Sequence, residues 1–270
     1  MSVLAATTFA RRRQRAGELR ARYSFAGAVL TLYEALLDVQ EAAVGGRPPA
    51  EDLAGWASLQ ILPGVVEATI RVGPPLLAGA VRGRLTGCEP AQLLLRWLAD
   101  GELEPIDRYL ARASLSPCLE AWPEWVAVCA GTRAEGRCPD CGALPQLSWT
   151  APSGDPLVAG RRHLLCSRCH RSWTAARCCP SCGERDGARL PVFGERAPAG
   201  VLDDAGGVGE AVLPQLRIES CERCNSYLVH VDLTRDHGAL PEVDELAAIP
   251  LDLYAQERGL RKITPNLMGF

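Results

Sequence analysis

The 270-residue sequence lacks several features that mark common functional classes. No segment reaches the roughly 18 apolar residues that a transmembrane helix requires. The arginines of residues 11–15 are not followed by the apolar run of an export signal. No glycine-rich phosphate loop and no nucleophile–base pair is recognisable. We therefore expect a cytoplasmic protein without membrane insertion and without enzyme activity, and we interpret residues 1–23 as a solvated basic arm.

Charge and aromatic content argue against a general affinity for nucleic acid. The net charge is −3 and aromatic residues make up 6% of the chain, which leaves few rings for base stacking. One local exception is the stretch 160–189, where arginines outnumber Glu184 and Asp186. This stretch is either a solvated face or a docking patch for an acidic or phosphate-bearing partner. Its arginines are Arg161, Arg162, Arg168, Arg171, Arg177, Arg185 and Arg189.

Cysteine, by contrast, is abundant, with 12 residues. Eight of them form four Cys-x-x-Cys pairs: Cys138 with Cys141, Cys166 with Cys169, Cys179 with Cys182, and Cys221 with Cys224. One tight turn of this spacing aims two sulfurs at an ion, and two such turns complete a site with four cysteine ligands. We expect the first two pairs to form one site and the last two pairs another. The spacing suits zinc and iron equally.

The residues that follow the cysteine pairs also indicate metal-binding knuckles. Gly142 and Gly183 follow the first and third pairs, where a metal-binding knuckle commonly requires a positive φ. The other thiols lack ligand spacing, so Cys88, Cys118 and Cys129 are expected to be buried apolar residues and Cys178 a bystander. Because eight thiolates already fill two sites, the four histidines are expected to lie at the surface or to contact the ligands without binding the metal.

Helical periodicity dominates the first half of the chain, with a clear apolar stripe from Phe25 to Leu36. Further helices are expected over 51–59, 65–71, 75–85, 90–99 and 105–113, and Ser116 and Pro117 are expected to open a separate helix over 118–130. Apolar residues at helical spacing predict a terminal helix around Leu253 and Tyr254. The glycine-rich stretch 194–209 is interpreted as a surface insertion.

The expected fold class is therefore α+β: an N-terminal all-α bundle, two tandem rubredoxin-like or zinc-ribbon-like β modules, and a C-terminal helix. The expected domains are a helical domain over 1–134, a first four-cysteine ribbon module over 135–177, a second four-cysteine ribbon module over 178–235, and a C-terminal helical extension over 236–270.

This order of elements resembles the FdhE family, the accessory proteins that act in maturation of respiratory formate dehydrogenases. The similarity covers about residues 20–270. It is most specific at Cys138-Pro-x-Cys-Gly142, at Leu165-Cys-x-x-Cys-x-x-x-Trp173, at Cys179-Pro-x-Cys-Gly183, and in the ending 251–269. The resemblance implies a non-enzymatic protein that binds the catalytic subunit of a molybdenum-dependent formate dehydrogenase before export. It also implies iron in two rubredoxin-type sites, with zinc as the alternative metal.

The residues alone are also compatible with two other functions, that of a zinc-ribbon nucleic-acid-binding protein and that of a rubredoxin-like redox protein. A homodimer is also compatible with the sequence. We expect the partner to dock on the arginine-rich stretch Arg161–Arg189 together with the terminal helix around Leu253 and Tyr254.

Overall fold

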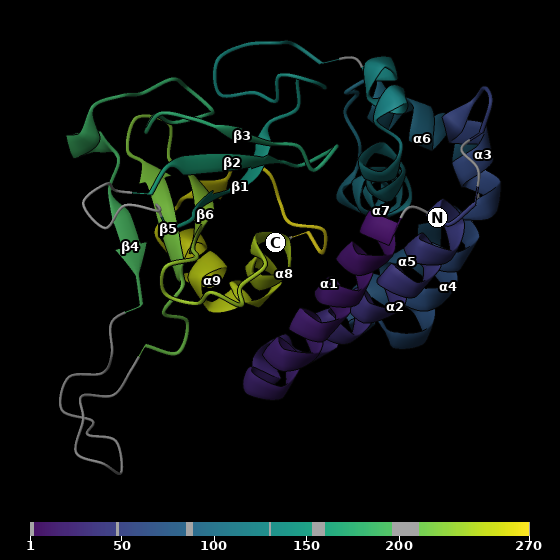
Figure 1. The fold of residues 1–270 in the computed structure, drawn as a ribbon, viewed down its shortest axis with the longest axis horizontal. Coiled ribbons are helices and arrows are strands. Elements are labelled where there is room, and N and C mark those ends of the chain that lie inside the picture. Colours follow the sequence, from purple (N-terminus) through teal and green to yellow (C-terminus); the bar gives the residue numbers. More distant parts are fainter. Residues whose placement is uncertain are drawn as a thin grey trace.

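The computed structural model describes residues 3–46, 49–84, 89–129, 131–152, 160–195 and 211–269. A helical part lies beside a part built on a β-sheet (Figure 1), which confirms the expected α+β class. The helices of the first part are α1 (Val3–Arg22), α2 (Gly27–Val44), α3 (Leu53–Gln60), α4 (Leu62–Val72), α5 (Pro75–Arg84), α6 (Pro90–Leu98) and α7 (Pro105–Ala121).

The sheet is mixed and joins both cysteine regions. Its strands follow the order β3-β2-β1-β6-β5-β4, and β7 pairs with β6. Strands β1 and β6 run parallel, with Leu147 opposite Val229, whereas the other neighbours along this order are antiparallel. The strands are β1 (Pro145–Thr150), β2 (Arg162–Cys166), β3 (Ser172–Thr174), β4 (Val192–Gly194), β5 (Leu216–Cys221), β6 (Ser226–Asp232) and β7 (Arg261–Lys262).

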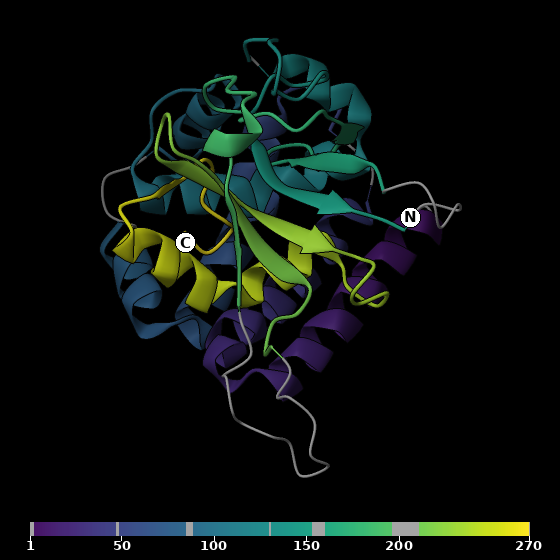
Figure 2. The ribbon, with the colours of Figure 1, turned by 90° about the vertical axis from the view of Figure 1, so that its left-hand side faces the viewer.

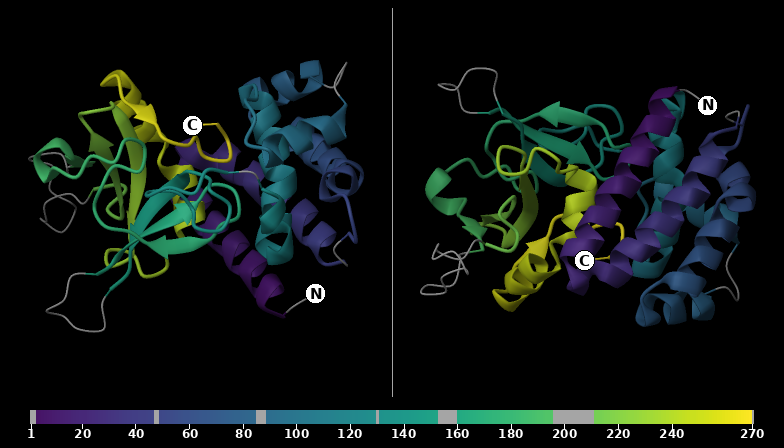
Figure 3. Two further views of the ribbon diagram at one scale, coloured as in Figure 1. Left: turned by 90° about the horizontal axis from the view of Figure 1, so that it is seen from above. Right: turned by 60° about the horizontal axis from the view of Figure 1, so that its bottom comes forward.

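Two short C-terminal helices, α8 (Pro241–Asp244) and α9 (Ile249–Glu257), pack against the sheet. The sheet lies in front of these helices in Figure 2, with the helical part behind them. One apolar core runs through both parts, because Leu36 and Leu115 of the helices belong to the same buried cluster as Val229 and Leu246. The end of the chain runs between the two parts (Figure 3), where Arg112 Nη1 donates to the Pro265 carbonyl at 2.8 Å.

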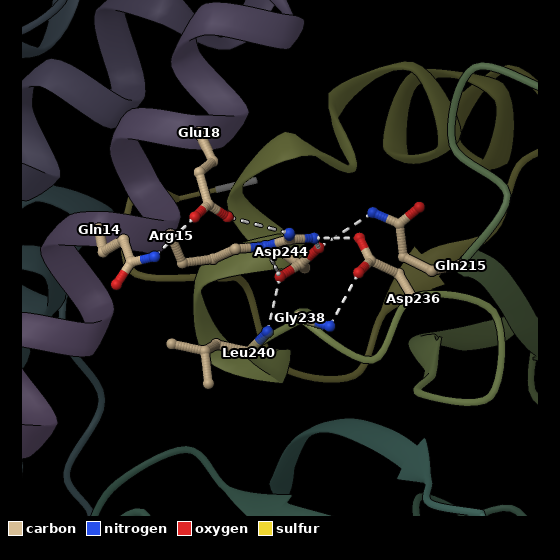
Figure 4. Close-up of polar contacts among 8 residues, drawn as sticks. All are labelled: Gln14, Arg15, Glu18, Gln215, Asp236, Gly238, Leu240 and Asp244. Atoms are coloured by element: carbon tan, nitrogen blue, oxygen red, sulfur yellow. Dashed lines mark hydrogen bonds and ion pairs between the residues drawn. The ribbon is translucent and has the colours of Figure 1, made fainter.

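The expectation that residues 1–23 form a solvated arm is wrong. Residues Val3–Arg22 form α1, which packs on α2 and α8 (Figure 1). Arg15 is 5% exposed, and its guanidinium donates from Nε to Asp244 at 2.9 Å and from Nη2 to Asp236 at 2.6 Å (Figure 4). Arg12 forms ion pairs with Glu120 and Glu242 at 2.7 and 3.0 Å. These arginines therefore bind the N-terminal helix to the C-terminal region.

The expected helix break at Ser116 and Pro117 is also wrong, because α7 continues to Ala121. A proline inside a helix lacks the N–H that would donate to the carbonyl four residues earlier, here that of Ala113. Gln40 of α2 supplies the missing donor, since its Nε2 lies 2.9 Å from the Ala113 oxygen. A side chain from a neighbouring helix thus satisfies the group that would otherwise end α7.

Contrary to the expectation that no segment is apolar enough for a transmembrane helix, the stretch Leu53–Val72 passes that test when judged by length and composition alone. It consists of α3 and α4, which meet at Ile61, and 44% of its most apolar window is buried. Ile61 and Val65 are fully buried in the core, so this stretch contributes to packing between helices.

Candidate metal centres

The first cysteine cluster consists of Cys138, Cys141, Cys166 and Cys169, whose sulfur atoms lie within 4.8 Å of one another. The Sγ atoms of Cys138 and Cys169 are 3.7 Å apart, and those of Cys141 and Cys166 are 3.3 Å apart. A tetrahedral ion with metal–sulfur bonds of about 2.3 Å holds its sulfurs about 3.8 Å apart, whereas a disulfide needs about 2.05 Å. The arrangement therefore fits a four-coordinate ion and no disulfide.

The second cysteine cluster repeats this geometry with Cys179, Cys182, Cys221 and Cys224. Cys179 lies 3.6 Å from Cys224, and Cys182 lies 3.6 Å from Cys221, measured between Sγ atoms. All four residues of the first cluster are buried, but Cys182 and Cys224 are partly exposed. The structure thus gathers the eight cysteines in the sequential order expected, and their role as ligands stays a prediction.

A left-handed residue follows the second cysteine of every pair. Gly142 and Gly183 have φ of 74° and 75°, as expected for the two glycines, while His170 and Asn225 have φ of 56° and 51°. A Cβ on Gly142 would lie 2.5 Å from the carbonyl carbon of Gly131, so no side chain fits there. Sequence reasoning missed the two non-glycine positions, although asparagine is a residue that tolerates this conformation.

The sulfur atoms of the first cluster accept hydrogen bonds and interact with one another. The backbone N–H of Arg168 donates to the Sγ of Cys166 at 3.3 Å. Hydrogen bonds from the neighbouring thiols lower the pKa of Cys138, and the interaction with Cys138 raises the pKa of Cys166. A bound cation would displace the protons of these thiols.

The thiols outside the two clusters are buried where the structure describes them. Burial raises the pKa of Cys118 to about 12 and that of Cys129 to about 11. Cys178 is also buried, and Cys88 lies outside the described residues. Neither Cys118 nor Cys129 joins a four-sulfur group, which agrees with their expected role as buried apolar residues.

The histidines have other partners. The His163 ring stacks on Trp149, with centroids 4.2 Å apart, and His170 Nδ1 lies 3.1 Å from a Glu120 oxygen. His230 Nδ1 lies 2.9 Å from the hydroxyl of Ser148. Each of the two described sulfur groups contains cysteines alone. The side chain of His237 is exposed, and the expected glycine-rich insertion 194–209 lies almost entirely outside the described residues.

The arginine-rich stretch is only partly a surface. Arg162 is 12% exposed and forms an ion pair with Glu219 at 2.7 Å. Arg168 is 4% exposed, forms an ion pair with Asp100, and places its guanidinium 5.2 Å from the centre of the Trp97 ring. The expectation that these two arginines dock a partner is therefore wrong, because both are held inside the fold. The exposed members are Arg161, Arg171, Arg177, Arg185 and Arg189.

Comparison with known proteins gives a consistent result. Residues 203–268 match a family model described as FdhE, C-terminal domain. The chain is 29% identical over 183 residues to a protein FdhE homolog of Aquifex aeolicus, covering 67% of this chain and 59% of that protein. It is 31% identical over 156 residues to one of Pseudomonas putida, covering 55% and 44%. The matches thus span about half the length of these relatives.

A solved structure shares the whole fold. The crystal structure of the FdhE protein from Pseudomonas aeruginosa superposes with a TM-score of 0.67 at 24% identity. The match covers 96% of this chain and 95% of that chain. The helical part and the sheet with its knuckles therefore occur together in a known architecture.

Proposed function

Because the chain belongs to the FdhE family, we propose that it is a non-enzymatic accessory protein in the maturation of formate dehydrogenase. The observation that carries this proposal is the pair of four-cysteine clusters within a fold shared with an FdhE protein. The sequence matches cover part of each relative, and the cysteine clusters support the same function independently.

We propose that each cluster holds one iron ion in a rubredoxin-type site, with zinc as the alternative metal. The sulfur separations of 3.3 to 3.7 Å within the two clusters support four-coordinate thiolate ligation. Bound iron would supply a one-electron redox centre and a cross-link. The cross-links would tie the knuckle before β1 to the end of β2, and the knuckle before β4 to the hairpin of β5 and β6. Small metal sites of this kind contribute directly to folding.

We propose that the catalytic subunit of formate dehydrogenase docks on the exposed arginines of the knuckle region together with α9. Arg171, Arg185 and Arg189 have side chains that are 57 to 60% exposed. Each of them forms an ion pair with a carboxylate of this chain. Leu253 of α9 is an apolar side chain that is 51% exposed. A guanidinium bound to an acidic partner gives a salt-sensitive interaction.

The test is a pull-down of the catalytic subunit with a variant that carries Arg171→Glu, Arg185→Glu and Arg189→Glu. We expect weaker capture and stronger salt dependence, with metal content unchanged. The control is Arg11→Glu, an exposed arginine on α1, which should keep full capture. A parallel assay uses duplex DNA. If the triple variant keeps its partner but loses DNA binding, the docking proposal fails and the zinc-ribbon function replaces it.

A further inference from the structure

A hollow of 310 Å³ lies between the helical part and the first cysteine cluster. Its walls come from three regions of the chain: the turn after α6 with α7, the two knuckles of the first cluster, and the segment after β7. Four arginines line it. Arg108 and Arg112 belong to α7, Arg137 precedes the first knuckle, and Arg168 lies within the second knuckle.

Three of these guanidiniums contact neutral groups. Among the described residues, Arg108, Arg112 and Arg137 form no ion pair, and their hydrogen bonds go to backbone carbonyls. These bonds are Arg108 Nη2 to Leu103 at 3.3 Å, Arg112 Nη1 to Pro265 at 2.8 Å, and Arg137 Nη1 to Gly142 at 3.0 Å. Arg168 differs, because it forms an ion pair with Asp100.

The charge around the hollow is therefore unbalanced. The lining contains two carboxylates, those of Asp100 and Glu102, against four guanidiniums, so two positive charges are in excess. Arg112 is 8% exposed, and its burial lowers its pKa to about 10, although the charges of Glu245 and Cys166 oppose that shift. A buried cation without a hydrogen-bonded anion is costly. A bound anion would remove that cost.

Negative charges already in the protein offer a competing explanation. Arg112 interacts electrostatically with the buried carboxylate of Glu245 and with Cys166, and four thiolates around a divalent ion carry two negative charges. These interactions leave Arg108 unexplained, since this exposed residue of α7 also lines the hollow. The two explanations differ in whether the metal-loaded protein binds an added anion.

We propose that this hollow binds a small molecule carrying a phosphate or carboxylate group, held by Arg108, Arg112 and Arg137. Guanidinium groups bind both oxyanions through paired hydrogen bonds. The volume lies at the lower end of the range of about 300–1,000 Å³ found for small-molecule sites. No cysteine of the two clusters lines the hollow, and none of the arginines of the docking face proposed above does, so its test needs no formate dehydrogenase.

The experiment is isothermal titration of the metal-loaded protein with inorganic pyrophosphate and, separately, with citrate. We expect one saturable site for at least one probe, and the comparison of the two probes shows whether phosphate or carboxylate is preferred. Arg108→Gln and Arg137→Gln should each weaken binding about tenfold or more, since each removes a charge-assisted contact. Arg235→Gln is the control, because this arginine is 55% exposed and pairs with Asp232 outside the hollow. It should bind as the parent protein does.

Two results would overturn the proposal. One is the absence of saturable binding of either probe to the metal-loaded parent protein. The other is equal binding by the parent and by both lining variants. Metal content is measured for every variant, so that a loss of binding is not confused with loss of the cluster. If Arg137→Gln disturbs its adjacent knuckle, Arg108→Gln on α7 still decides the question.

Discussion

Replacing Arg15 by methionine is expected to destabilise the protein by about 3–5 kcal/mol, the usual range for removing one partner of a buried ion pair. Arg15 is 5% exposed and Asp244 is fully buried, and the two side chains form a bidentate contact across the interface between α1 and the C-terminal region (Figure 4). Burial opposes the charge on Arg15, but hydrogen bonds with Asp244 and Asp236 raise its pKa overall. Methionine preserves much of the packing volume and leaves the Asp244 carboxylate without its cation.

The assay is urea unfolding followed by circular dichroism on the metal-loaded protein. The control, Arg11→Met, changes an exposed arginine of the same helix and is expected to shift the unfolding free energy by less than about 0.5 kcal/mol. The double variant Arg15→Met, Asp244→Asn should recover part of the loss, because no buried charge then remains uncompensated. A loss below about 1 kcal/mol for Arg15→Met would refute the reasoning.

Other buried groups give three further predictions. Gln40→Leu leaves the carbonyl freed by Pro117 without a donor and should cost about 1–3 kcal/mol in urea unfolding. Adding Pro117→Ala should recover most of that cost, and no recovery would contradict this role of Gln40. Burial opposes the Glu219 charge, but Arg162 lowers its pKa overall. The loss of unfolding free energy caused by Arg162→Gln should therefore be largest above about pH 4.3, the ordinary pKa of a glutamate. It should decrease as the pH falls through the lower pKa of Glu219 in the folded protein, as measured by unfolding at a series of pH values. Cys118, with its pKa raised to about 12, should react slowly with a thiol reagent at neutral pH, and rapid labelling of the native protein would contradict its burial.

The geometry of each cysteine pair could be predicted from the sequence because it depends on residues that are close together along the chain. Two residues between cysteines define a turn, and a proline and a glycine around that turn fix its backbone, as at Pro139 and Gly142. The helices α2 to α6 follow from their apolar periodicity for the same reason, whereas α1 and the full length of α7 do not. These features depend on neighbours within a few residues along the chain.

The features that sequence reasoning missed depend on distant partners. Pro117 is tolerated within α7 because Gln40, 73 residues before the carbonyl it binds, donates the missing hydrogen bond. Arg15 is buried because Asp244 lies opposite it, and no pattern near residue 15 indicates this. The parallel pairing of β1 with β6, which merges the two cysteine regions into one sheet, likewise joins segments far apart in sequence.

The central claim is that the two cysteine clusters are separate metal sites, and metal content with visible absorption tests it most directly. We expect about two ions per chain in the purified protein, with thiolate-to-iron bands. Cys138→Ser and Cys221→Ser should each lose one ion, whereas Cys118→Ala should keep both. A parent protein without bound metal and with eight freely reactive knuckle thiols would contradict the claim. So would the loss of both ions from Cys138→Ser while the helical part remains folded.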